Sequence, residues 1–285
     1  MTAETTVGVV FGFDDVLAPD STTVLLEQNG IDPEAFWEEK FQRRITEGYD
    51  PTTAYLTTLL AEIGEDGRLG RLTADDLRAV GAELDDRLFD GVEGLFDSLH
   101  EIADGYDGVR VECYVVSEGL RSILTGTSLA DECAAVYGSE LATDGNGRVT
   151  GVRRPLSFTD KTNCLFEINK GIERTEIRRN PYAVNESVDT EDRPIPFENV
   201  VYVGDGITDV PCFSLVKERG GRVFGVFDEN ERSIKQRVAR NVGAPQRAEN
   251  LNPPRYTESS RLGSLLRLTV EGLCAEREID GLEAL

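Results

Sequence analysis

Short runs of apolar residues, each followed by glycine or acidic residues, recur along the chain. They cover residues 6–13, 109–117, 198–206 and 221–227, with a weaker run at 133–140. Runs of this length without polar alternation are typical of strands that are buried on both faces. Stretches with the helical spacing of apolar residues lie between them. This alternation predicts an α/β fold with a parallel sheet covered by helices.

The interval between the first and second apolar runs is too long for a single crossover helix. It contains several stretches of helical periodicity, and Thr73 followed by Asp75 and Asp76 is typical of a helix start. We therefore expect residues 19–104 to form an inserted helical domain, and residues 1–18 and 105–285 to form the α/β core.

The inserted segment carries a group of large apolar side chains. We expect these residues to pack a small core of their own rather than to contact a ligand: Phe36, Trp37, Phe41, Tyr55 and Leu59. Polar and charged residues of the same segment, Arg43, Glu47 and Tyr49, are expected on its surface, although they are also candidates for contact with a ligand.

The second half of the chain gives three further predictions. Residues 140–153 contain the turn sequence Asp-Gly-Asn-Gly and are predicted to form a β-hairpin. Residues 172–198 are polar and rich in proline and charge, which favours a surface loop. Residues 259–277 are predicted to form a C-terminal helix.

Charge is the most unusual feature of the composition. The chain has 53 acidic and 30 basic residues, a formal net charge of −23, and only five of its basic residues are lysines. A surface rich in carboxylates and poor in lysine is typical of proteins from halophiles, because molar salt screens the self-repulsion. The charge also argues against a nucleic-acid partner, because no basic stripe is present to contact phosphates.

The cysteines and the hydropathy pattern indicate a compartment. Five cysteines at wide spacings, without a Cys-x-x-Cys pair, favour reduced thiols over disulfides or a zinc site. No long apolar run is present, and the N-terminus lacks a basic segment followed by an apolar stretch. We therefore expect a cytoplasmic protein without a membrane partner.

Polar residues follow the apolar runs at the places where parallel strands would end. They are Asp14 and Asp15, then Ser117, then Lys161 after the hairpin, and finally Asp205 and Asp209 in the sequence GDGITD. Open α/β sheets bind ligands at the carboxyl ends of their strands. Carboxylates suit a magnesium ion, and a lysine with a serine hydroxyl suits a phosphate.

In this order, the four motifs resemble the signature of the haloacid dehalogenase-like (HAD) hydrolase superfamily. The inserted helical segment resembles its C1-type cap, and the hairpin before Lys161 is similar to that of the phosphoserine phosphatase branch. The resemblance implies a Rossmann-like parallel sheet with a helical C1 cap. It also implies a Mg²⁺-dependent site that acts on a small phosphorylated metabolite, and it leaves the oligomeric state open.

The resemblance assigns contacts with the phosphorylated group to two motifs. Ser117, together with the following residues Glu118 and Gly119, would bind the transferring phosphoryl group. Lys161 would neutralise the negative charge of that group.

The remaining motifs supply acids. Asp205 and Asp209 would bind magnesium, together with Asp14. In the motif GFDDVL, Asp14 falls on the second aspartate of the family motif, which is the general acid and base, and Val16 takes the Thr or Val place.

The first aspartate of that motif, the nucleophile, falls on Gly12. A glycine has no side chain to attack phosphorus. A shifted alignment would make Asp14 the nucleophile, but it would lose the match at Val16 and Leu17. His100, the only histidine, lies away from every motif, which excludes Ser-His-Asp and Cys-His chemistry.

Three interpretations therefore stay open. The chain is a phosphatase of the HAD type that is impaired by the loss of its nucleophile, or a non-catalytic HAD pseudo-enzyme that binds a phosphorylated ligand or a metal. In the third, Gly12 is a sequence variant of an otherwise active enzyme.

Overall fold

The computed structural model describes residues 5–227, 248 and 250–283, and it confirms the predicted α/β fold. Within this part of the chain a sheet of seven strands has the order β4-β3-β2-β1-β5-β6-β7. All pairs are parallel except the antiparallel pair of β3 and β4. The strands are β1 (Thr5–Phe11), β2 (Val109–Leu120), β3 (Ala135–Thr143), β4 (Val149–Arg154), β5 (Val200–Gly204), β6 (Arg222–Val226) and β7 (Asn250–Asn252).

Strand β1 lies between β2 and β5, and its side chains enter two separate cores. Val7, Val9 and Phe11 belong to one buried cluster, while Val10 belongs to another on the opposite face. This explains why the run is apolar without alternation: both faces of the strand are covered.

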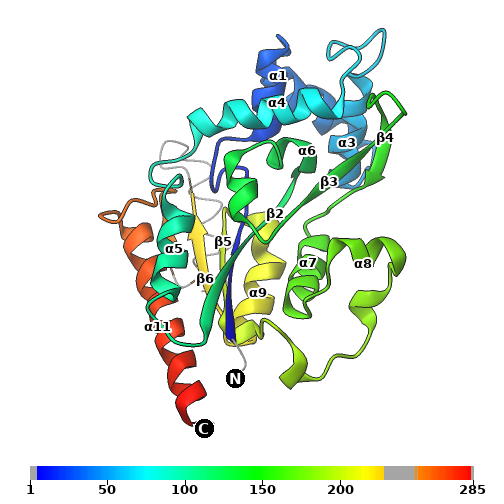
Figure 1. The fold of residues 1–285 in the computed structure, drawn as a ribbon. Coiled ribbons are helices and arrows are strands. Elements are labelled where there is room, and N and C mark those ends of the chain that lie inside the picture. The colour runs from blue at the N-terminus through cyan, green and yellow to red at the C-terminus, as the bar shows by residue number, and fades with distance from the viewer. Residues whose placement is uncertain (1–4, 228–247, 249, 284–285) are drawn as a thin grey trace.

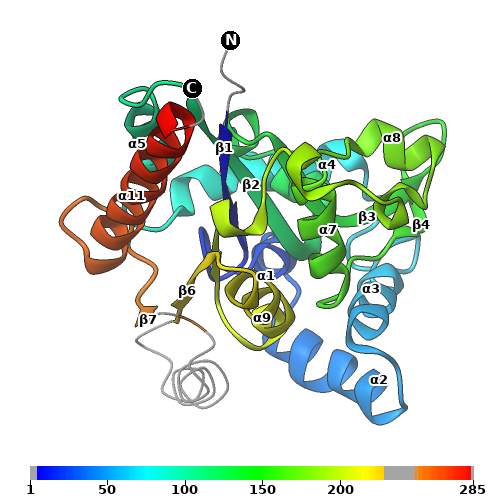
Figure 2. The ribbon, with the colours of Figure 1, turned by 90° about the horizontal axis from the view of Figure 1, so that it is seen from below.

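Two pairs of helices cover the two faces of the sheet (Figures 1 and 2). Helices α5 (Leu95–Ala103) and α11 (Arg261–Glu283) pack together on one face, with α5 against β2. Helices α7 (Asp160–Asn169) and α9 (Val210–Glu218) pack together on the other, with α9 against β5 and β6. The sheet is therefore the middle layer of three, as the buried strands predicted.

The segment between β1 and β2 is helical, as predicted. It contains α1 (Ser21–Gln28), a π-helical stretch (Ala35–Phe41), α2 (Gln42–Thr46), α3 (Pro51–Ala61) and α4 (Ala74–Leu84), besides α5. Helix α4 begins at Thr73, whose side chain and that of Asp76 each accept a backbone N–H in a reciprocal cap. Helices α1, α3 and α4 gather beyond one end of the sheet (Figure 1).

Helix α5 differs from the rest of this segment in what it contacts. It packs against β2 and α11, within the layers of the core, although it lies inside the range 19–104. The division of the chain into core and cap domains at residues 18 and 104 stays a prediction.

The hairpin prediction is confirmed, whereas the loop prediction is only partly right. Strands β3 and β4 pair antiparallel, and their turn closes with Gly147 N–H donating to the Asp144 carbonyl over 3.0 Å. Residues 172–198 contain a short helix, α8 (Arg174–Arg179), besides irregular turns. Lys170, which directly follows α7, anchors this stretch, because its Nζ donates to the Val184 carbonyl over 2.7 Å.

The cysteines match the prediction, since all five are free thiols. Among the helices of the described residues, none has the length and apolar composition that a membrane crossing requires.

Distant parts of the chain hold the turn that follows β1. The Tyr256 hydroxyl donates to the Val16 carbonyl over 2.8 Å, and Phe89 N–H donates to the Leu17 carbonyl over 2.9 Å. Tyr256 is fully buried and its N–H donates to the Asp90 carbonyl over 2.6 Å. The turn is thus fixed by the segments that enter α5 and α11.

Candidate active site

Strand β1 ends at Phe11, so the residues of the motif GFDDVL lie in the turn that follows the strand. Gly12 N–H still donates to the Val203 carbonyl of β5 over 2.8 Å, but the chain then folds back on itself. The Phe13 carbonyl accepts the N–H of Leu17 at 2.9 Å, and Asp15 adopts a φ of 59°, in the left-handed region. This tight turn exposes the side chain of Asp15 at the edge of the sheet.

Asp14 and Ser117 meet at this edge, as the motif order predicted. The Ser117 hydroxyl donates to Asp14 Oδ2 over 2.8 Å, and Ser21 N–H donates to Asp14 Oδ1 over 2.7 Å. Gly119 N–H donates to Ser117 Oγ over 3.0 Å. A β-carbon at residue 119 would lie 2.5 Å from Asp14 Oδ2, so glycine is required here for the close approach.

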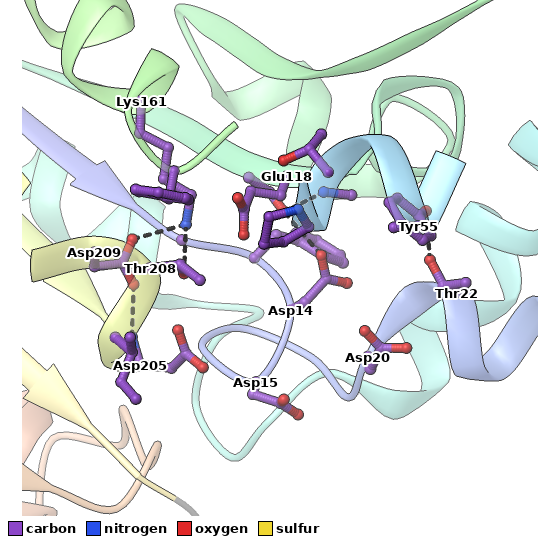
Figure 3. Close-up of a pocket in the computed structure, with 18 of the residues that line it drawn as sticks. Asp14, Asp15, Asp20, Thr22, Tyr55, Glu118, Lys161, Asp205, Thr208 and Asp209 are labelled. Carbon is purple, nitrogen blue, oxygen red and sulfur yellow. Dashed lines mark hydrogen bonds and ion pairs between the residues drawn. The ribbon is translucent and has the colours of Figure 1, made fainter. Parts of the chain in front are cut away.

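Lys161 and Asp209 form a buried ion pair on the other side of the same site (Figure 3). Lys161 Nζ lies 2.8 Å from Asp209 Oδ1, and only 4% and 0% of the two residues is exposed. The Tyr202 hydroxyl donates to the same oxygen over 2.7 Å, and Asp205 N–H donates to Asp209 Oδ2 over 3.0 Å. Lys161 also donates to Thr208 Oγ1 over 3.2 Å.

The pairing sets the charge states of both groups. Burial alone would lower the pKa of Lys161, but the carboxylate of Asp209 overrides burial and holds that pKa above its ordinary value. Burial alone would raise the pKa of Asp209, but the ammonium and the hydrogen bonds hold it below its ordinary value. Both groups are therefore ionised in the folded protein at neutral pH.

Three other carboxyl groups have raised pKa values. Burial, with the nearby Asp209, raises the pKa of Asp205 well above its ordinary value, and burial also raises the pKa of Glu118. Burial and the neighbouring Asp14 raise the pKa of Asp20 to about 7. Burial is the largest cause of all three shifts, and repulsion from neighbouring carboxylates adds to it.

The motif residues line one cavity of about 450 Å³. The described residues that line it include six acids and one base: Asp14, Asp15, Asp20, Glu118, Asp205, Asp209 and Lys161. Hydroxyl groups and glycines line it as well: Thr22, Thr52, Ser117, Thr208, Gly12 and Gly119. The cavity has the size of a small-molecule site.

The inserted helical segment supplies an aromatic wall of the cavity. Phe36, Tyr55 and Leu59 belong to a buried hydrophobic cluster, and Trp37 and Phe41 pack against it, which agrees with the predicted packing. Trp37, Phe41 and Tyr55 also line the cavity. Trp37 also contacts the rings of Phe41 and Tyr55. Because the same side chains serve the core and the cavity wall, their spacing along the chain did not indicate which of them line the cavity. Of the surface candidates in this segment, Arg43, Glu47 and Tyr49 are absent from the cavity wall.

Asp20 and Thr22 also line the cavity, although neither belongs to the predicted motifs. Asp20 begins α1 by accepting Thr23 N–H over 2.6 Å, and Thr22 shares a 2.7 Å hydrogen bond with the Tyr55 hydroxyl. The sequence Asp-Ser-Thr ahead of an apolar run is typical of a helix start. A helix that begins directly after the first strand has its first residues near the carboxyl end of the sheet, so this signal could have indicated both residues.

The space beside Gly12 is already in use. A β-carbon built on Gly12 would lie 2.8 Å from Cγ2 of Val16 and 3.8 Å from the Val203 carbonyl oxygen. Real β-carbons do not approach that closely, so a side chain at residue 12 requires Val16 to move.

The predicted magnesium ligands are not gathered into a cluster of three side chains among the described residues. Among the described residues no group of three or more His, Cys, Asp or Glu side chains is placed to hold a metal ion. Asp14 and Asp209 each use both carboxylate oxygens to accept hydrogen bonds from the chain itself. Gly12 offers no oxygen from a side chain. Magnesium binding by Asp14, Asp205 and Asp209 therefore stays a prediction.

Comparison with known proteins gives one relative in sequence. No protein-family model matches the chain. An uncharacterized protein from Borreliella burgdorferi is 27% identical over 285 residues, covering 91% of this chain and 94% of its own.

Solved structures share the fold at low sequence identity. A HAD family hydrolase from Salmonella enterica serovar Typhi matches with a TM-score of 0.58 and 13% identity, over 94% of this chain and 72% of that one. A probable phosphoserine phosphatase from Vibrio cholerae gives 0.56 and 14%, over 96% and 67%. A phosphoserine phosphatase with bound substrate gives 0.53 and 15%, over 92% and 98%. The chain therefore has the fold of the HAD hydrolases, in the form that phosphoserine phosphatases share.

Proposed function

We propose that this chain binds a small phosphorylated metabolite in the cavity beneath the aromatic wall, at a HAD-type phosphomonoester site whose hydrolytic activity is impaired. One observation carries the proposal. Lys161, Ser117, Asp14 and Asp205 line a single cavity, while Gly12 stands where the resemblance requires the nucleophile. The fold shared with HAD hydrolases and phosphoserine phosphatases supports it.

The roles follow from the chemistry of each group. Lys161 is charged and lines the cavity, so it would hold phosphate oxygens by charge, and the Ser117 hydroxyl would turn from Asp14 to donate to them. Asp14 would exchange a proton with the ester oxygen. No group at residue 12 can form an aspartyl-phosphate, so the covalent route has no first step.

A second candidate is a non-catalytic protein with the same ligand. The observation that favours it is the position of Val16, whose methyl group occupies the space of a β-carbon at residue 12.

The test is hydrolysis of p-nitrophenyl phosphate with Mg²⁺ in high salt, by the unmodified chain, Gly12→Asp and Gly12→Ala. We expect Gly12→Asp to raise the rate by about 10³-fold, because one member of a cooperating catalytic set commonly accounts for several orders of magnitude. Gly12→Ala adds the same β-carbon without the carboxylate and should stay at background.

Two results would contradict the proposal in different ways. Robust turnover by the unmodified chain would show that it has another nucleophile. No turnover by any of the three, together with no binding of inorganic phosphate, would remove the phosphomonoester assignment.

A further inference from the structure

Two large apolar side chains line the cavity from the loops that carry the site motifs. Phe158 precedes α7, and Ile207 follows β5. Phe41 of the inserted helical segment lines the same cavity. We infer that the phosphorylated ligand is the ester of an uncharged, apolar alcohol, whose hydrocarbon part binds against Phe41, Phe158 and Ile207. This inference rests on the proposed function and adds the chemical class of the part of the ligand that is not phosphate.

Phe158 and Ile207 have no place in the hydrophobic cores of the described residues. Neither is part of the two buried clusters or of the partly buried side chains that pack against them. Ile207 is 47% exposed. Apolar surface that stays in contact with water gains free energy when an apolar group covers it. Packing of the fold therefore does not explain these two side chains, whereas an apolar ligand does.

Both side chains are close along the chain to the groups that would hold the phosphate. Lys161 N–H donates to the Ser157 carbonyl over 3.1 Å, so Phe158 and Lys161 lie in one turn of the chain. Asp209 N–H donates to the Gly206 carbonyl over 3.1 Å, so Ile207 and Asp209 lie in one turn as well. A ligand whose phosphate contacts Lys161 therefore brings the carbon atoms next to the phosphate toward apolar side chains.

The far side of the cavity does not provide a better place for polar groups. Figure 3 shows Thr22 and Tyr55 on the side away from Lys161, and their hydroxyl groups share a hydrogen bond of 2.7 Å. The N–H of the Trp37 ring is also used within the chain, because it donates to Thr23 Oγ1 over 3.1 Å. A polar ligand group here would lose water without gaining the Trp37 donor as a partner, which is unfavourable.

A second anionic group on the ligand fits poorly. Lys161 is the single cation among the described residues that line the cavity, and it is paired with Asp209 at 2.8 Å. A carboxylate on the ligand would therefore enter a wall that contains other carboxyl groups and no further cation. We expect this cavity to reject phosphoserine, although the chain shares its fold with phosphoserine phosphatases.

The first experiment measures the binding of two phosphate esters of similar shape to the unmodified chain, by calorimetry in fixed high salt. Isobutyl phosphate has methyl groups in place of the amino and carboxylate groups of O-phosphoserine. We expect isobutyl phosphate to bind more tightly by about 10-fold or more, because each buried methyl group contributes favourable transfer free energy. O-phosphoserine that binds as tightly as isobutyl phosphate, or more tightly, would overturn the inference.

A second pair of probes differs only in the amount of apolar surface. Phenyl phosphate should bind about 10-fold or more tightly than ethyl phosphate. Its heat capacity change on binding should also be more negative, which is the signature of apolar burial. Equal affinities and equal heat capacity changes for the two esters would overturn the inference.

Variants then locate the contact. Phe158→Ala and Ile207→Thr should each weaken phenyl phosphate by about 5-fold or more, and ethyl phosphate much less, because each removes apolar surface from the cavity wall. The matched control is Leu268→Thr, since Leu268 is an apolar residue of α11 that is 63% exposed and absent from the cavity wall. It should leave both affinities unchanged. An equal loss in all three variants, or no loss in the two cavity variants, would overturn the inference.

Phenol separates this inference from the proposed function. Phenyl phosphate binding more tightly than both phenol and ethyl phosphate supports both proposals. Ethyl phosphate binding as tightly as phenyl phosphate overturns the apolar contact and leaves the phosphate site standing. Phenol binding as tightly as phenyl phosphate has the opposite meaning, because the apolar contact stands and the phosphate site fails. Absence of binding for all of these probes would overturn both.

Discussion

The ammonium of Lys161 lies 2.8 Å from Oδ1 of Asp209, and the two side chains are almost completely buried. Each charge is tolerated in the interior because of the other, since a buried charge without a partner costs far more free energy than an exposed one. This pair links α7 to the start of α9, and with Tyr202 it fixes the floor of the candidate site.

Removing either partner should destabilise the fold. We expect Lys161→Met and Asp209→Asn each to lower the free energy of unfolding by about 3–5 kcal/mol, as measured by urea denaturation. The control is Glu65→Gln, which breaks an exposed ion pair with Arg71 and should cost less than about 1 kcal/mol. Losses of similar size in the exposed and buried pairs would contradict the assigned role of burial.

Side chains at residue 12 should compete with Val16 for space. Gly12→Ala should cost about 1–3 kcal/mol, because its β-carbon would lie 2.8 Å from Cγ2 of Val16. In a Val16→Ala background the same substitution should cost clearly less, and a double-mutant cycle by urea unfolding measures the difference. Additive effects would show that Val16 does not occupy the space of the missing side chain.

The raised pKa of Asp20 predicts a pH dependence of stability. In the folded chain Asp20 keeps its proton up to a pKa of about 7, whereas the unfolded chain releases it near the ordinary value of 3.8. Between these values the folded state binds more protons, so the free energy of unfolding should fall as the pH rises from about 4 to 7. Asp20→Asn should flatten this slope. A slope that is unchanged in the variant would assign the effect to other carboxyl groups.

Metal removal should leave the unliganded protein unchanged. Asp14 and Asp209 already use both of their oxygens, so dialysis against EDTA should shift the melting temperature by less than about 1 °C, and added Mg²⁺ should not raise it. Gly12→Asp supplies a new carboxylate and should make the melting temperature depend on Mg²⁺. A marked loss of stability in EDTA for the unmodified chain would reveal a metal site that the described residues do not form.

The net charge of −23 predicts stabilisation by salt. The screening length falls from about 10 Å at 0.1 M ionic strength to about 3 Å at 1 M, which suppresses repulsion between surface carboxylates. The midpoint of urea unfolding should therefore rise between 0.1 and 2 M KCl. Unchanged or lower midpoints would count against adaptation to high salt.

Local patterns were sufficient to predict most of the sheet. Each predicted apolar run overlaps an observed strand, because strands covered on both faces must be apolar throughout. The start of α4 at Thr73 was also predictable, since a helix cap depends on residues close together in the sequence. The short strand β7 and the helix α8 carry no such signal, and they were not predicted.

The site was predictable only in part, for a different reason. The order of Asp14, Ser117, Lys161 and Asp205 indicated where the strands end, and all four line the cavity. Whether Trp37 faces a ligand depends on how α1 and α3 approach the sheet, which no spacing along the chain encodes. The hydrogen bond from the Tyr202 hydroxyl to Asp209 likewise depends on how the turn after β5 folds back over the strand, which the sequence pattern does not indicate.

The bond between the Tyr256 hydroxyl and the Val16 carbonyl joins residues 240 positions apart. A ribosome delivers the first motif long before it delivers Tyr256. The turn that carries Asp14 is therefore made with only part of its support, the bond from Phe89 N–H, and gains the Tyr256 bond 240 residues after Val16. A chain that is cut before Tyr256 would keep the strands of the candidate site but lack this bond to the turn that carries Asp14.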